Sequence, residues 1–474
     1  MNWEVVIGLE VHAGLSTKSK IFCSCSTVFG GEPNTQVCPV CSGMPGALPK
    51  LNRAVVEFAV KLGLVLGCKI AETCKFDRKN YFYPDLPKAY QVSQFYAPVC
   101  RGGGLEIEAG GGSKVIGIRQ IHMEEDAGKL IHEPAGGTFM DFNRCGVPLL
   151  EIVSEPDFRS AGEVVAYLER LRETLLYLEI CDCKMQEGSL RCDVNLSVRR
   201  PGEALGVRSE IKNLNSFKAV ARAIESESAR QVELLEGGGR VLQETRRWDD
   251  DRGLSFAMRS KENAQDYRYF PEPDLLPVVV DAGWLECIQK SLPELASEKR
   301  ARYTADFAIS REEAVFLTSH KNISDLFESL CVQSGEPAES AHLISGSVMQ
   351  LMNSAGVLPE ALSVDAGKLS YLIAQVLGGK INRASYKEVV AAVFTDGVDP
   401  AAYIAERGLL MQSDGGAALA AAQSVIDAHP GDVADYRAGK EKVFGFLMGQ
   451  LMKKLGGSGN PALAKETLKG LLDR

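Results

Sequence analysis

The sequence lacks long hydrophobic runs, which excludes the simplest way of entering a membrane. Its longest apolar stretches, such as Leu275–Val280 and Ala417–Ala422, are far shorter than the about 20 residues that a helix needs to cross a bilayer. No apolar segment typical of a secretory signal precedes Trp3, and no internal repeat is apparent. We therefore expect a soluble, non-repetitive, cytoplasmic protein. Its 474 residues are enough for two or three hydrophobic cores.

An excess of positive charge is also missing. The 53 Lys and Arg residues are outnumbered by 62 Asp and Glu residues, and the net charge is −9. Such a chain does not attract nucleic acid over its whole surface, so a nucleic-acid partner has to be held by a local basic patch. Neither a GxSxG nucleophile elbow nor a Walker A phosphate loop is present, and only six histidines occur. The commonest serine-hydrolase and P-loop mechanisms are thereby excluded.

Thirteen cysteines are present, and their odd number favours a reducing compartment over a disulfide scaffold. Cys23 and Cys25 form one close pair, and Cys38 and Cys41 form a second. Two such pairs can supply the four thiolates that tetrahedral zinc binds at about 2.3 Å. Four ordinary buried thiols are the main alternative, and disulfides are a further one. The spacing predicts a structural zinc site, because four thiolates leave no open coordination position.

Two segments alternate between apolar and polar residues and are predicted to be strands. In Glu4–Ala13, the alternation puts Glu10 and His12 on one polar face. Arg191–Val198 repeats the pattern and carries Asp193 on its polar face. Strands of this kind present polar side chains to an open cleft while their other face packs on a core.

Helix signals are interspersed with these strands up to about Pro293, and beyond that residue the sequence shows mainly helix signals. Ser160 begins a capping box ahead of a helical pattern that ends at Leu178, and a second helix is expected from Ser216. Ser310 caps a further helix beyond the boundary. The predicted class is α+β, built on an antiparallel sheet. The predicted domains are 1–293, 294–405 and 406–474.

Carboxylates dominate the polar clusters of the first domain. Oxygen ligands with an imidazole suit a hard divalent ion such as magnesium, which commonly joins protein carboxylates to nucleotide phosphates. The candidate residues are Glu10, His12, Glu125, Glu151, Asp193 and Glu210, with Lys79 and Lys212 as candidate phosphate-binding groups. Any one of these acids alone could be an ordinary surface residue. The rigid loop that follows Lys79 could form a substrate wall, stack on a base or simply pack on the surface.

The last segment is basic, with eight Lys and Arg against three Asp and Glu from Arg437 to Arg474. A helix there would place Phe444, Leu447, Leu451 and Leu455 in a core. Its lysines would then face solvent. These lysines are Lys440, Lys442, Lys453 and Lys454. They form either a solvated surface or a contact for nucleic acid.

Long composite motifs in fixed order run through nearly the whole chain. They are Gly8–His12, the four cysteines, Lys79–Lys88, His122–Lys129, Asp141–Arg144, Arg191–Asn195, Glu210–Phe217 and Asp266–Asp274. This series resembles the GatB family, the B subunits of aspartyl/glutamyl-tRNA amidotransferases. The resemblance implies a catalytic cradle related in fold to glutamine synthetase, then a helical domain, then a small helical tail of the YqeY type.

The resemblance also implies a reaction. Such subunits use ATP to phosphorylate the side-chain carboxylate of Glu or Asp misacylated on a glutamine or asparagine tRNA, and ammonia then displaces phosphate. In the family, ammonia comes from an amidase-type A subunit, and a small C subunit completes a heterotrimer. No serine-rich amidase signature occurs in this sequence, so we expect one part of an assembly.

Residue roles follow from this resemblance as expectations. Glu10, His12 and Glu125 are the leading magnesium ligands, and Glu151 is a further candidate. Asp193 and Glu210 complete a metal or ATP site. Lys79 and Lys212 hold phosphate oxygens, and the tail lysines contact tRNA. Family tails often continue with more basic residues, whereas here Leu455–Pro461 follows Lys454. We also expect Glu125→Ala to leave the fold intact and abolish amidation.

Two other functions are compatible with parts of this pattern. A zinc-stabilised RNA-binding protein would use the thiolates and the basic tail, but it would not need so many acids near a cleft. A stand-alone amidoligase of the glutamine synthetase type would explain the acids, but it would act on a free amino acid and would not need the tail. ATP turnover and dependence on charged tRNA separate these functions.

Overall fold

The computed structural model describes residues 2–133, 136–260, 267–411, 415–455 and 461–473. The chain forms two compact units, Met1–Leu295 and Ala296–Arg474. Their boundary lies close to Pro293, where the composition of the sequence changes. Among the described residues, no helix has the length and apolar content needed to cross a membrane.

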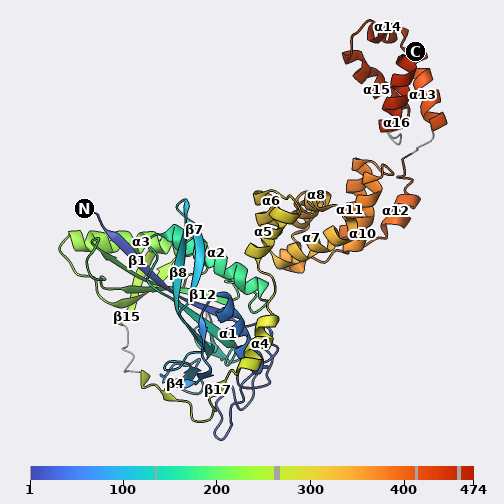
Figure 1. Ribbon diagram of the computed structural model, residues 1–474. Helices are drawn as coiled ribbons and strands as arrows, with labels where there is room; N and C mark the ends of the chain where they lie inside the picture. Colours follow the sequence, from blue (N-terminus) through green and yellow to red (C-terminus); the bar gives the residue numbers. More distant parts are fainter. Residues whose placement is uncertain (1, 134–135, 261–266, 412–414, 456–460, 474) are drawn as a thin grey trace. The chain divides into compact units, whose positions relative to one another are not determined.

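The first unit is built on a sheet of ten strands. Its strands are β1 (Glu4–Gly14), β2 (Lys69–Ile70), β6 (Cys100–Arg101), β7 (Gly104–Ala109), β8 (Gly112–Glu125), β11 (Pro148–Ser154), β12 (Leu190–Arg199), β13 (Ser209–Lys212), β14 (Glu244–Asp249) and β15 (Leu254–Ser260). The order is β15-β14-β13-β12-β1-β11-β8-β6-β2, and β7 pairs with β8 (Figure 1). Neighbours are antiparallel except β13 and β14, which run parallel. A mixed class with a large, mainly antiparallel sheet is confirmed.

Three small sheets surround the large one. The first contains β16 (Phe270–Pro271), β4 (Asp77–Asn80) and β5 (Tyr90–Ser93). The second pairs β17 (Val278–Val279) with β3 (Thr73–Cys74), and the third pairs β9 (Lys129–His132) with β10 (Thr138–Asp141). Residues far apart in the sequence are thereby brought beside the loop that follows Lys79.

Within its described residues, the first unit also has four α-helices: α1 (Arg53–Val65), α2 (Ala161–Tyr177), α3 (Phe217–Glu236) and α4 (Ala282–Lys290). Two of them begin at the predicted caps. The Ser160 hydroxyl accepts a hydrogen bond from the Glu163 N–H at 3.2 Å, and the Ser216 hydroxyl accepts one from the Ala219 N–H at 3.0 Å. Each bond satisfies a donor that the first turn of a helix leaves open.

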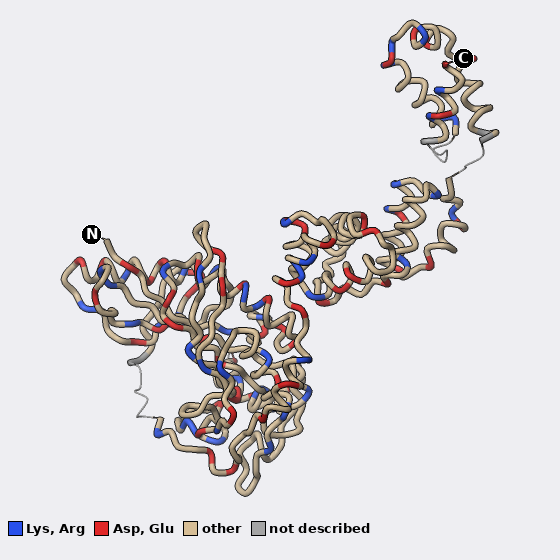
Figure 2. The backbone as a smooth tube through the Cα atoms, viewed as in Figure 1, with Lys and Arg blue, Asp and Glu red and all other residues tan. Residues whose placement is uncertain are grey.

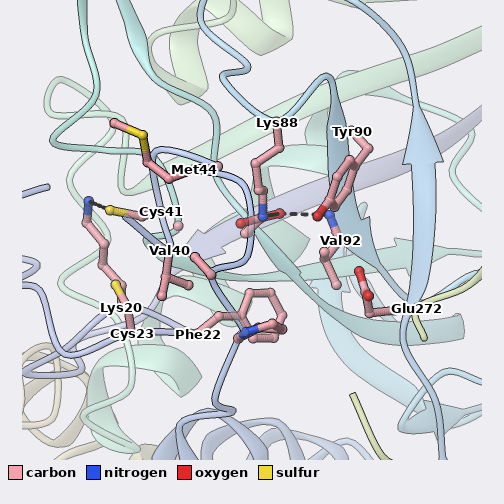
Figure 3. A pocket seen from close by; sticks show the side chains of 15 residues that line it. Lys20, Phe22, Cys23, Val40, Cys41, Met44, Lys88, Tyr90, Val92 and Glu272 are labelled. Atoms are coloured by element: carbon pink, nitrogen blue, oxygen red, sulfur yellow. Dashed lines mark hydrogen bonds and ion pairs between the residues drawn. The ribbon is translucent and has the colours of Figure 1, made fainter. Parts of the chain in front are cut away.

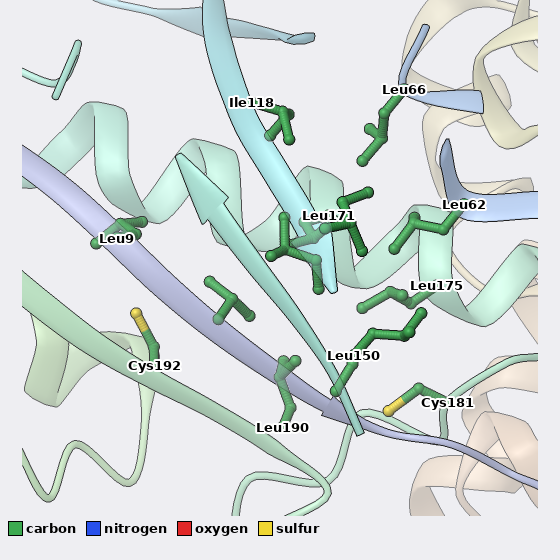
Figure 4. Packing of buried hydrophobic residues seen from close by; sticks show 14 of the residues in the cluster. Leu9, Leu62, Leu66, Ile118, Leu150, Leu171, Leu175, Cys181, Leu190 and Cys192 are labelled. Atoms are coloured by element: carbon green, nitrogen blue, oxygen red, sulfur yellow. The ribbon is translucent and has the colours of Figure 1, made fainter. Parts of the chain in front are cut away.

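Helices cover one face of the large sheet. α2 packs on β7 and α3, and α3 packs on β12. Figure 4 shows Leu171 and Leu175 of α2 near Leu150 of β11, and Leu9 of β1 belongs to the same buried cluster. Burying one leucine contributes roughly 1.5–3 kcal/mol, and a shift of one residue would turn every apolar side chain to the wrong face. This packing sets the strand register, and the register determines which polar residues share the opposite face.

The second unit is helical. Its elements are α5 (Ala296–Asp306), α6 (Arg311–Leu317), α7 (Lys321–Ser334), α8 (Pro337–His342), η2 (Leu343–Val348), α9 (Met349–Ala355), η3 (Pro359–Ala361), α10 (Ala366–Leu377), α11 (Arg383–Asp396), α12 (Pro400–Glu406), α13 (Gly415–Ala428), α14 (Pro430–Arg437), α15 (Lys442–Lys454) and α16 (Pro461–Leu472). It has two apolar cores, one drawn from residues 303–404 and the other from residues 422–472. Leu447 and Leu451 are buried in the latter, and Phe444 and Leu455 pack against it, as the helical pattern predicts.

Candidate active site

Glu10 and His12 lie on the same face of β1, because residues i and i+2 of a strand point the same way. β1 lies between β11 and β12 in the sheet. The register places His12 opposite Glu151 on β11, and Glu10 opposite Asp193 on β12. Each β1 residue therefore begins a separate acidic group. The two residues are about 7 Å apart along the strand.

The first acidic group consists of His12, Glu124 and Glu151, which bring one possible ligand atom each within 4.8 Å of one another. The Nε2 atom of His12 lies 3.4 Å from Glu124 Oε1 and 3.5 Å from Glu151 Oε2. His122 contacts Glu151 Oε2 through Nε2 at 2.7 Å, and its Nδ1 lies 2.8 Å from the Gln94 carbonyl oxygen. Two carboxylates and an imidazole at this separation suit a hard divalent cation.

His12 and the neighbouring His122 favour their charged forms. Burial opposes the charge on His12, but Glu151, Glu124 and Asp193 together outweigh burial, so the pKa of His12 is raised to about 9. The same balance of burial against Glu151 raises the pKa of His122 to about 9. Burial also works against the charged form of Glu151, yet the two imidazoles hold the pKa of that carboxyl well below its usual value. A divalent cation bound here would replace a proton, because metal-bound imidazole is neutral.

The second acidic group consists of Glu10, Asp193 and Glu210. Lys212 pairs with Asp193, and its Nζ lies 3.4 Å from Glu210 Oε1. Burial would lower the pKa of Lys212, but Asp193 and Glu210 raise it above its ordinary value, so the ammonium form is stable. The group therefore combines three carboxylates with a cation that can meet a phosphate.

Glu125 belongs to neither acidic group. Adjacent residues of a strand face opposite sides, so Glu124 points to His12 while Glu125 points away. The Glu125 carboxylate pairs with Lys88 and accepts a hydrogen bond from the Val92 N–H at 2.9 Å. Glu125 and Lys88 both line a small cavity of about 90 Å³ (Figure 3). The prediction that placed Glu125 beside His12 and Glu10 is corrected here, because Glu124 takes that place.

Lys79 lies among aromatic rings beside the first group. Its Nζ is 4.8 Å from the ring centroid of Tyr267 and 5.6 Å from that of Tyr81. Burial, with the charge of Glu124 next in size, raises the pKa of Tyr81 above its ordinary value. The Tyr81 side chain is therefore close to the acids, whereas the next residue, Phe82, is 81% exposed. Of the alternatives for this loop, a wall beside the acids fits Tyr81 best.

The four predicted zinc ligands come together. One sulfur from each of Cys23, Cys25, Cys38 and Cys41 lies within 4.8 Å of the others. A hydrogen bond with Cys23, helped by the charge of Lys20, lowers the pKa of the Cys41 thiol to about 4. Four sulfurs at this separation fit tetrahedral zinc.

Lys20 is fully buried beneath these sulfurs. Its Nζ lies 3.5 Å from Cys41 Sγ and donates to the Gln36 carbonyl oxygen at 2.7 Å (Figure 3). Zinc with four thiolates carries a net charge of about −2, which a buried ammonium offsets. Lys20 would therefore stabilise a zinc-bound state of these sulfurs.

We expect Lys20→Met to accelerate the loss of zinc to a chelator by about 10- to 100-fold, because outer-sphere partners of metal ligands have effects of that size. Zinc content and the rate of zinc release are the measurements. Lys18→Met, at an exposed lysine of the same segment, is the matched control. Equal release rates in the two variants would contradict the role of Lys20.

A larger cavity, of about 650 Å³, lies where β1 and β8 end and where β11 and β12 begin. Its lining includes Asp126, Arg144 and Arg191. Arg191 donates from Nη2 to Asp126 Oδ2 at 2.7 Å, and Arg144 Nε lies 3.5 Å from the same oxygen. A cavity of about 450 Å³ lies at the ends of β13 and β14, lined in part by Asn213, Arg247 and Trp248.

Residues 5–286 match the family described as the GatB/GatE catalytic domain, and residues 325–472 match the family described as the GatB domain. The chain belongs to the GatB family. The first match contains both acidic groups, the four clustered cysteines and the cavities, and the second match contains α15.

Relatives named as the B subunit of aspartyl/glutamyl-tRNA(Asn/Gln) amidotransferase match over nearly the full length of this chain. The relative from Lachnoclostridium phytofermentans is 54% identical over 474 residues, which cover 100% of this chain and 99% of the relative. The relative from Caldicellulosiruptor bescii is 51% identical over 479 residues and all of both chains. The relative from Moorella thermoacetica is 50% identical over 473 residues, or 99% of both.

Three residues of this candidate site are not among those selected from the sequence: Glu124, His122 and Arg191. Each lies in one of the composite motifs, His122–Lys129 or Arg191–Asn195. For Glu124 the useful signal was the period of two in His122–Glu124, which separates Glu124 from Glu125. Arg191 lies two residues before Asp193 on the same polar face of β12.

Proposed function

We propose that this chain is the B subunit of a tRNA-dependent amidotransferase that amidates the side-chain carboxylate of Glu or Asp misacylated on tRNA(Gln) or tRNA(Asn). The names of its relatives support the substrate class. The observation that carries the proposal is the pair of acidic groups on either side of β1. Two such groups can serve two negatively charged reactants, a carboxylate and ATP.

The reaction has two steps. A carboxylate oxygen attacks the γ-phosphorus of ATP, and ADP leaves with the bridging oxygen. Ammonia then attacks the acyl carbon, phosphate leaves, and the nitrogen loses a proton to give the amide. Activation is needed because a carboxylate is already anionic and a poor electrophile. Mg²⁺ held by the two groups would neutralise the charge that opposes phosphoryl transfer.

The chain's own residues divide this work. His12, Glu124 and Glu151 would hold one cation, and Glu10, Asp193 and Glu210 would hold another or orient ATP. Lys212, already charged between Asp193 and Glu210, is placed for a phosphate oxygen, and Lys79 is the candidate on the other side. Electrostatic groups fixed before the reaction need no reorganisation when charge moves.

Ammonia is proposed to come from an amidase-type A subunit, in a heterotrimer with a small C subunit. The zinc site would hold the loop of Cys23–Cys41 in place and take no part in the reaction, because four thiolates leave no open position. A cytoplasmic location remains a prediction. The similarity in fold between the first unit and glutamine synthetase also remains a prediction.

The test supplies ATP, ammonium and misacylated tRNA to the assembled complex and measures amidated aminoacyl-tRNA. Product that depends on all three supports the proposal. Amidation of free glutamate without tRNA would identify a stand-alone amidoligase instead. Binding of tRNA without ATP turnover would identify an RNA-binding protein without catalytic function.

The tail lysines provide a separate prediction. Lys453 and Lys454 are exposed at the end of α15, while Lys440 pairs with Asp435 at 2.9 Å. Figure 2 shows basic and acidic residues interspersed along the described chain, so a tRNA contact here depends on a few cations. The neighbouring residues 456–460 lie outside the described ranges.

We expect the double change Lys453→Gln and Lys454→Gln to weaken tRNA binding and to reduce the slope of log K against log salt by about 1 to 2, because each phosphate contact releases about one counterion. Lys442 would contribute in the same way. The measurement is tRNA affinity at several salt concentrations. Lys387→Gln, at an exposed lysine of α11, is the control, and an equal slope in both variants would argue against the tail contact.

A further inference from the structure

We propose that the 650 Å³ cavity receives the 3′-terminal aminoacyl nucleoside of the charged tRNA, with Arg191 holding the distal carboxylate of the amino acid and Phe29 stacking on the terminal base. This inference rests on the proposed function. It adds the place where the substrate enters and the two side chains that recognise it.

Arg191 joins the cavity to the first acidic group. It lies opposite His12 in the β1–β12 register and lines the cavity. One edge of its guanidinium is held by Asp126, whereas its Nε is buried and has no hydrogen-bond partner among the residues that the structure describes. The side chain as a whole remains 36% exposed. A carboxylate entering from the cavity would pair with the exposed part of this guanidinium and would arrive next to the His12 group.

Phe29 provides an apolar surface on the cavity wall. It is 66% exposed, although it is a large aromatic residue. It follows Cys23 and Cys25 closely in the sequence, and the Thr27 hydroxyl donates to the Thr17 carbonyl oxygen, so its loop is fixed on one side. Exposed aromatic rings on fixed loops are the usual platform for an unpaired base. The zinc site then has a functional consequence, because it positions this ring.

Size and charge favour an aminoacyl nucleoside over ATP. The volume lies within the range of about 300–1,000 Å³ that small-ligand sites occupy. The charged lining comprises three basic and four acidic side chains: Lys129, Arg144, Arg191, Asp126, Asp141, Asp182 and Glu187. This balance opposes a triphosphate. It suits an aminoacyl ester, which carries one carboxylate and one ammonium group.

The experiment uses the assembled complex and a non-reactive analogue, adenosine that carries glutamate through a 3′-amide bond. We expect this analogue to bind by calorimetry and to compete with charged tRNA but not with ATP. Phe29→Ala should raise KM for charged tRNA about tenfold and leave KM for ATP unchanged, and Phe29→Tyr should restore it. Phe139→Ala, at a 63% exposed phenylalanine of β10 that does not line the cavity, is the matched control.

Arg191→Gln should lower kcat about 100-fold and should remove the preference for binding Glu-tRNA over Gln-tRNA, which differ only at the distal carboxyl group. A merely structural role would not affect that preference. Competition of the analogue with ATP, or unchanged KM in Phe29→Ala together with an unchanged preference in Arg191→Gln, would overturn the inference. Failure of the wild-type complex to amidate while it still binds the analogue would contradict the proposed function alone.

Discussion

Replacing Glu151 with glutamine is expected to lower ATP-dependent amidation about a thousandfold while glutamine hydrolysis by the partner continues. Glu151 accepts contacts from both His12 and His122, and it belongs to the group of three possible ligands around His12. Glutamine keeps the shape but removes the charge that a divalent cation and the two imidazoles require. Losses of about 10²–10³ are typical when one preorganised electrostatic group is removed. The measurement is the rate of amidation with ammonium, so that ammonia supply does not limit it.

Glu155→Gln is the matched control. Glu155 follows β11 directly, but its side chain is 40% exposed and pairs with Arg119 on the surface. We expect this variant to amidate at the wild-type rate. A loss of similar size in both variants would mean that charge near β11 matters in general and would contradict a specific role for Glu151.

Replacing Lys88 with methionine is expected to lower the free energy of unfolding of the first unit by about 3–5 kcal/mol. The Glu125 side chain is only 4% exposed and that of Lys88 is 12% exposed. Methionine keeps much of the apolar stem but leaves a buried carboxylate without its cation. For the same reason, Glu125→Ala is now expected to destabilise the fold, contrary to the expectation from the sequence. Urea unfolding measures the effect.

The double change Lys88→Met and Glu125→Gln should recover most of the lost stability, because it removes both charges at once. Lys290→Met is the control at the surface, since Lys290 pairs with Glu286 within α4 and both side chains are mostly exposed. Exposed pairs of this kind contribute about 0–1 kcal/mol. If Lys88→Met and Lys290→Met cost the same, the buried pair does not stabilise the fold as described.

Predictions that depend on neighbours along the chain agree with the structure. The alternation of β1 put Glu10 and His12 on one face, and the capping residues Ser160 and Ser216 mark helix starts. The cysteine spacing brought four sulfurs together, since both pairs lie within one short segment. In each case the pattern spans fewer than twenty residues, so local geometry is sufficient.

The assignment of Glu125 failed because it required a choice between two adjacent acids. Glu124 and Glu125 have the same chemistry, and the alternation of Ile121–Glu124 is broken only at Glu125, where a charged residue follows a charged residue. The choice depends on which face of β8 lies on the side of His12 and which on the side of Lys88, and these two residues come from distant parts of the chain.

Family membership, the mixed class and every member of the two acidic groups except Glu124 thus follow from order and pattern along the chain. The division of the acidic residues into two groups does not follow from the sequence. Neither do the buried, unpartnered Nε of Arg191 and the cavity beside that side chain. Those features arise from the antiparallel register of β1 with β11 and β12, which brings His12 to Glu151 and Glu10 to Asp193. Register is set by packing the apolar faces on the helices, a long-range free energy that no short stretch of sequence contains.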